Sequence, residues 1–159
     1  MASKTILGIS PGTRVLGIAI IINGQLVDWR VKTFKEKWSR EKHTGIISII
    51  GKLIDYYDVK VLSVKKIDPL KSSRQLDHLI ESIEKLATRK RVSIKHYSLS
   101  DLAVGKRSGK RDGKAKLTEQ LVEKHPELQK EYLKERNNRV EYYTKMFEAV
   151  AIAERCREW

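Results

Sequence analysis

The pattern of apolar and polar positions predicts three short strands at the start of the chain. Apolar residues run almost without interruption through 5–10 and 15–22, which is typical of strands buried on both faces. Pro11-Gly12 separates the two runs, and Asn23-Gly24 ends the second. Asn-Gly favours a tight hairpin because both residues tolerate a positive φ. Residues 25–34 then alternate between apolar and polar, so we expect an antiparallel meander.

Helical spacing begins after Ser39, which is a suitable cap for a helix over 40–57. A strand at 59–64 follows, then a helix from Ser72 or Ser73 to about residue 90, a strand at 92–97, and two or three helices broken near Pro126, the last over 140–157. The pattern predicts one α/β domain over 1–159. Its mixed five-stranded sheet, three antiparallel strands then two parallel ones with helices on both faces, has the element order of the ribonuclease H-like fold.

The distribution of charged residues along the chain indicates a candidate partner. Lys and Arg number 33 against 20 Asp and Glu, a net charge of +13. Residues 60–116 hold sixteen of these cations and six of the acids, a net +10. Such clustering favours nucleic acid over a surface that is charged only for solubility. We expect phosphate contacts from a basic, glycine-containing loop at 105–116 and from the residues before it: Lys66, Lys71, Arg74, Lys106, Arg107, Lys110, Arg111, Lys114 and Lys116.

Other classes of site have little support in the sequence. The single cysteine, Cys156, cannot form an internal disulfide, and the longest apolar run near the N-terminus is too short to span a bilayer. We therefore expect a cytoplasmic protein. The four histidines lie on separate predicted elements without metal-ligand spacing, so we expect surface or edge positions for them: His43, His78, His96 and His125.

Two segments carry a resemblance to a known family. The opening Ile6–Gly17 (ILGISPGTRVLG) resembles the first hairpin of the RuvC-type Holliday-junction resolvases, in which a strand ends in Ile-Asp-Pro-Gly-Ser/Thr. The closing Glu148–Ala153 (EAVAIA) resembles the last helix of that family. The match covers the whole chain in element order and length, and it is specific at the two ends. The resemblance implies a ribonuclease H-like fold and a junction-related function in DNA recombination and repair.

The resemblance also implies a set of four carboxylates that hold two divalent ions. The corresponding positions here are Ser10, Lys65, Lys145 and Glu148, so a charge of −4 becomes +1. Such a site will not gather two Mg²⁺ ions. We expect a pseudoenzyme without metal or other cofactor, which binds branched or duplex DNA without cutting it. We also expect the four residues to converge, with Lys65 or Lys145 within about 4 Å of Glu148.

The sequence is also compatible with two other functions. A junction endonuclease would need Mg²⁺ at a site rebuilt from Glu148 together with Asp28, Glu141 or Asp68. A non-catalytic protein-interaction module would show no salt-dependent DNA binding. We further expect a homodimer that uses an apolar stripe on the second long helix, with some of the stripe exposed on the monomer: Leu76, Leu79, Ile80 and Ile83.

Overall fold

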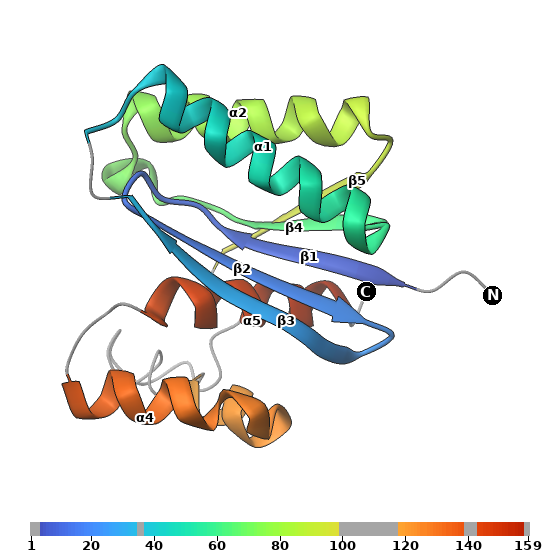
Figure 1. Ribbon diagram of the computed structural model, residues 1–159, viewed down its shortest axis with the longest axis vertical. Coiled ribbons are helices and arrows are strands. Elements are labelled where there is room, and N and C mark those ends of the chain that lie inside the picture. The colour runs from blue at the N-terminus through green and yellow to red at the C-terminus, as the bar shows by residue number, and fades with distance from the viewer. Residues whose placement is uncertain (1–3, 35–36, 99–117, 139–142, 158–159) are drawn as a thin grey trace.

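The computed structural model describes residues 4–34, 37–98, 118–138 and 143–157 (Figure 1). Its strands are β1 (Thr5–Ser10), β2 (Val15–Ile22), β3 (Gln25–Thr33), β4 (Val61–Lys65) and β5 (Ser93–Tyr97). Its labelled helices are α1 (Arg40–Tyr57), α2 (Arg74–Arg89), α4 (Gln129–Asn138) and α5 (Thr144–Arg157). Single 3₁₀ turns lie at η1 (Pro69–Lys71) and η3 (Pro126–Leu128), and residues 118–124 are also helical.

The five strands form one mixed sheet in the order β3-β2-β1-β4-β5. β1 pairs antiparallel with β2, and β2 with β3, whereas β4 is parallel to both β1 and β5. The β2–β3 turn has the expected left-handed residues, Asn23 with φ 51° and Gly24 with φ 85°. The expected fold class is therefore confirmed: three antiparallel strands followed by two parallel ones, with helices on both faces.

The sheet separates two hydrophobic layers. Helices α1 and α2 cover one face, and α5 covers the other, with α4 lying beyond α5 (Figure 1). Ile18, Ile50 and Leu79 are fully buried on the α1–α2 side, and Ala19, Val150 and Ala153 on the α5 side. The two long helices begin as expected, because the Ser39 and Ser73 hydroxyls accept hydrogen bonds from the first turns of α1 and α2.

Two strand glycines let α5 lie directly against the sheet. A Cβ atom added to Gly17 would stand 1.9 Å from the Lys145 carbonyl oxygen, and one added to Gly8 would stand 2.2 Å from that of Ala149. Any side chain at either position would push the helix away from the strands. The backbone of α5 near Lys145 is thereby fixed over β2, close to the Ser10 end of β1.

The apolar stripe of α2 is used inside the chain, so the expectation of an exposed stripe is wrong. Leu76 is 8% exposed, Leu79 and Ile83 are fully buried, and the partly buried Ile80 packs against the same core. The reason is that α2 lies over the sheet beside α1, so the core there buries Leu76, Leu79 and Ile83 and part of Ile80. Homodimer formation itself stays a prediction.

None of the helices in the described part of the chain has the length and apolarity that a bilayer crossing requires.

Candidate nucleic-acid interface

Polar side chains from three elements meet where the parallel strands β1 and β4 end. Ser10 closes β1 and Lys65 closes β4, and the two strands are neighbours in the sheet. Both residues alternate with core residues of the α1–α2 side, so they face α5. The carboxylate of Glu148, on the first turns of α5, lies between them. We call Ser10, Lys65, Lys145 and Glu148 the strand-end cluster.

Every other member of the cluster contacts Glu148. Lys65 Nζ lies 2.6 Å from Glu148 Oε2, and Lys145 Nζ lies 3.8 Å from Oε1. The Ser10 hydroxyl donates to Oε1 at 3.2 Å. The convergence and the ion pair expected from the sequence are therefore present, with Lys65 as the nearer cation.

The burial of the cluster makes this pairing necessary. The Glu148 side chain is 7% exposed, and the side chains of Lys65 and Lys145 are 17% and 29% exposed. An ionised carboxylate in so little solvent is costly unless it is paired and hydrogen-bonded. The two ammonium groups and the Ser10 hydroxyl meet that requirement from within the chain.

The residues of the cluster do not fit the pair of divalent ions implied by the family resemblance. Magnesium takes hard oxygen ligands, chiefly carboxylates, and two ammonium groups would repel it. Within the described residues, His, Cys, Asp and Glu form no group of three or more that could hold a metal ion. A two-metal mechanism of phosphodiester hydrolysis has no ligand set here among those residues.

Two of the three acids considered for a rebuilt site have other partners. Asp28 accepts hydrogen bonds from Arg30 at 2.8 Å and from Tyr57 at 2.7 Å. Partial burial acts to raise the pKa of Asp28, but these two hydrogen bonds outweigh it and keep the pKa below its ordinary value. Asp68 accepts from the Leu70 backbone N–H as the cap of η1. Glu141 lies outside the described residues.

The predicted phosphate-binding residues fall into two groups. Lys66 is exposed and directly follows Lys65 at the end of β4, and Arg74 is exposed in the first turn of α2. Lys71 closes η1 between them. The remaining six all belong to the basic loop and lie outside the described residues: Lys106, Arg107, Lys110, Arg111, Lys114 and Lys116.

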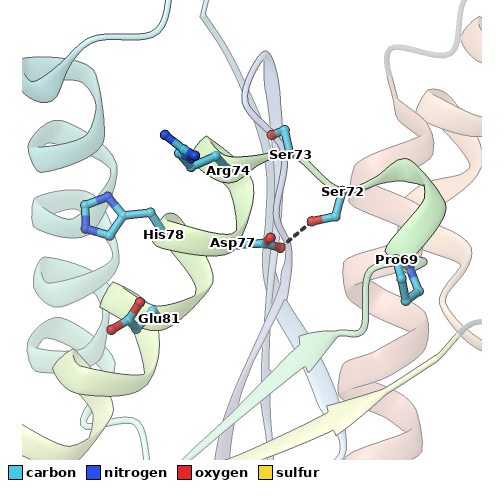
Figure 2. A pocket seen from close by; sticks show the side chains of 7 residues that line it. All are labelled: Pro69, Ser72, Ser73, Arg74, Asp77, His78 and Glu81. Carbon is cyan, nitrogen blue, oxygen red and sulfur yellow. Dashed lines mark hydrogen bonds between the residues drawn. The ribbon is translucent and has the colours of Figure 1, made fainter.

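Arg74 borders an open hollow of about 550 Å³ beside η1 (Figure 2). The other lining residues are Pro69, Ser72, Ser73, Asp77, His78 and Glu81, and the Ser72 hydroxyl donates to Asp77. Two carboxylates against one guanidinium make this hollow a poor place for a phosphate. The strand-end cluster is the more basic of the two surfaces.

Arg14 is a further basic residue near the strand-end cluster, and it is not among the phosphate-binding residues expected from the sequence. It is exposed and immediately precedes β2, and its carbonyl oxygen accepts from Phe34 N–H at 2.8 Å. Because β2 runs antiparallel to β1, its first residues return to the Ser10 end of the sheet. The tight turn at Pro11-Gly12 was the available signal, since a short connection between antiparallel strands brings both flanks to one edge.

The expectation of a surface or edge position is wrong for His125, which is 4% exposed. Its Nε2 lies 2.6 Å from Glu154 Oε1, and Lys124 Nζ lies 2.8 Å from Glu154 Oε2. Burial acts to raise the pKa of Glu154, but the contacts with His125 and Lys124 prevail and lower it to about 2. These contacts join the segment before η3 to α5. The sequence around His125 contains no signal that its partner, Glu154, lies 29 residues away.

Comparison with solved structures identifies the fold. The chain superposes on T. thermophilus RuvC in complex with a Holliday-junction substrate with a TM-score of 0.68, at 12% identity over 95% of this chain and 90% of that one. A second Thermus thermophilus RuvC structure gives 0.66 at 12% identity, over 94% and 91% of the two chains. The Fowlpox virus resolvase in complex with its substrate Holliday-junction DNA gives 0.61 at 13% identity, over 97% of each chain. No family model matches the sequence, and no curated protein sequence matches it.

These likenesses define the class of fold as ribonuclease H-like. Within that class, the arrangement is the RuvC type, as the two end motifs of the sequence indicated.

Proposed function

We propose that this protein binds branched or duplex DNA through backbone phosphates and does not cleave it. The observation that carries the proposal is the Lys65–Glu148 ion pair at 2.6 Å, at positions where the family resemblance implies metal-binding carboxylates. Glu148 is the only carboxylate in the cluster, and it is already neutralised by an ammonium group. A nucleic acid bound at this end of the sheet would contact cations, and the cluster lacks the set of carboxylates that would hold a metal ion to activate water.

The charges around the cluster support binding. Arg14 and Lys66 are exposed at the same edge of the sheet as Lys65 and Lys145. The basic loop adds six cations within twelve residues of sequence. Contacts of this kind neutralise phosphates and release counterions, which gives affinity without base selection.

The structural neighbours support the choice of partner. Both T. thermophilus RuvC and the Fowlpox virus resolvase were solved with Holliday-junction DNA. We infer that the present chain takes a related branched substrate. Such a protein would shield a junction or recruit other proteins to it, with a role in recombination or repair in the cytoplasm.

The salt dependence of binding tests the proposal. Binding of the full-length chain to a four-way junction, a duplex and a single strand is measured by fluorescence anisotropy over a range of salt. The logarithm of affinity should fall linearly with the logarithm of salt, with a slope of about −0.9 for each neutralised phosphate. A variant with Lys106, Arg107, Lys110 and Arg111 replaced by Ala should lose several units of that slope. No binding to any of the three DNAs would contradict the proposal and favour a protein-interaction module.

A junction nuclease with a rebuilt site is the competing function, since the fold is that of resolvases. It requires Mg²⁺- or Mn²⁺-dependent cleavage of a junction that Glu148→Ala abolishes. The proposal predicts no cleavage product with either ion.

A further inference from the structure

The edge of the sheet opposite the strand-end cluster carries a second row of cations. β1, β4 and β5 all begin there, on the right of Figure 1, where α2 also ends. Backbone hydrogen bonds place the starts of the strands side by side: Lys60 N–H donates to Thr5 O at 3.0 Å, and Ser93 N–H donates to Lys60 O at 3.2 Å. Five cations stand in this stretch: Lys4, Lys60, Arg89, Lys90 and Arg91.

The ion pairs of this row leave its arginines unmatched. Lys60 pairs with Asp58 at 3.1 Å, and Lys90 pairs with Asp55 at 2.9 Å. Arg89 and Arg91 are exposed, and neither has an ion-pair partner among the described residues. The two arginines are therefore the groups that we assign to an outside anion.

Arg91 directly follows the C-terminal cap of α2. Its φ is 57°, in the left-handed region, where glycine or asparagine is favoured. This conformation closes the helix, because the Arg91 N–H donates to Thr88 O at 3.2 Å and the Val92 N–H donates to Ala87 O at 2.9 Å. The capped helix end holds the Arg91 backbone in place, and its side chain is exposed to solvent.

We propose that Lys60, Arg89 and Arg91 form a second phosphate-binding surface, which takes the backbone of a nucleic-acid duplex. Guanidinium groups suit phosphate because their paired N–H donors match two phosphate oxygens. The row offers several ammonium and guanidinium groups close together, so we assign it to the regularly spaced phosphates of a duplex, and anionic lipid vesicles serve as the alternative in the test. One chain then holds two DNA segments, one at each end of the sheet.

The test is a bridging assay with the full-length chain. One duplex is fixed to beads, and capture of a second, fluorescent duplex is measured alongside anisotropy with a single duplex. The double variant Arg89→Gln/Arg91→Gly should lower bridging by at least about fivefold and change single-duplex affinity by less than about twofold. Glycine suits a φ of 57°, so this variant should keep its fold, which circular dichroism checks.

The matched control is Lys85→Gln/Lys130→Gln, which removes the same charge from exposed positions on α2 and α4. This control should bridge as well as the wild type. Unchanged bridging by the arginine variant would overturn the second surface, because bridging would then come from two copies that each bind through the strand-end cluster. Equal loss in the control would overturn it too, as would capture of anionic lipid vesicles without capture of a second duplex. If the wild type fails to bind even one duplex, the proposed function itself is wrong.

Discussion

Replacing Lys65 by Met removes the cation nearest to a buried carboxylate. The pair has a 2.6 Å contact, and its side chains are 17% and 7% exposed. Removing one partner of a buried ion pair costs about 3–5 kcal/mol, because the other charge is left without compensation. Ser10 and Lys145 still contact Glu148 in the variant, and Lys65 is partly solvated, so we expect a loss of about 2–3 kcal/mol in the free energy of unfolding.

Urea unfolding of the wild type, Lys65→Met, Glu148→Gln and the double variant measures this loss as a cycle. The double variant should cost no more than about 1 kcal/mol, since no buried charge then remains unpaired. Lys85→Met is the matched control, because Lys85 pairs with Glu81 at 3.3 Å with side chains 72% and 60% exposed. It should cost less than about 0.5 kcal/mol. Equal losses in Lys65→Met and Lys85→Met, or additive losses in the cycle, would refute the reasoning.

Two further changes test how α5 is held. Gly17→Ala should destabilise the protein by about 3 kcal/mol in urea unfolding, because the new Cβ meets the Lys145 carbonyl oxygen. The control Gly45→Ala in α1 has open space around the new Cβ and should stabilise the protein by about 0.5–1 kcal/mol. An equal effect at both sites would contradict the close packing of α5 on the sheet. Glu154 has a pKa of about 2, below its ordinary value of 4.5, so its contribution is complete above pH 4.5 and is lost as the pH falls through about 2. Glu154→Gln should therefore cost roughly 3 kcal/mol at pH 7 and progressively less below pH 4, and a deficit that does not change with pH would contradict the pairing with His125.

Much of the fold could be predicted because its signals are local. The runs at 5–10 and 15–22, the Asn23-Gly24 turn and the caps at Ser39 and Ser73 each act over a few residues. The strand predicted at 59–64 lies at Val61–Lys65. Shifts of one or two residues are expected, because local patterns do not fix the ends of an element. The burial of the α2 stripe inside the chain could not be predicted from local signals. Periodicity shows which positions are apolar, but it does not distinguish a face that packs inside the chain from one that packs against a second copy.

The strand-end cluster was predictable for a different reason. Ser10, Lys65 and Glu148 sit at positions that the order of elements brings together whatever their side chains are, so the resemblance at the two chain ends was enough. The His125–Glu154 pair and the row at Lys60 depend on contacts between distant segments with no motif of their own. Arg91 shows the same limit, because its left-handed backbone is visible only in the folded chain.

We propose that this RuvC-type fold binds DNA with a lysine–glutamate pair at the positions where the family resemblance implies a metal centre. The most direct measurement follows a labelled four-way junction with the purified protein in Mg²⁺, in Mn²⁺ and in EDTA, reading both binding and cleavage. We expect an intact junction under all three conditions, with binding retained in EDTA. Cleavage that depends on a divalent ion and disappears in Glu148→Ala, or binding lost on chelation, would contradict it.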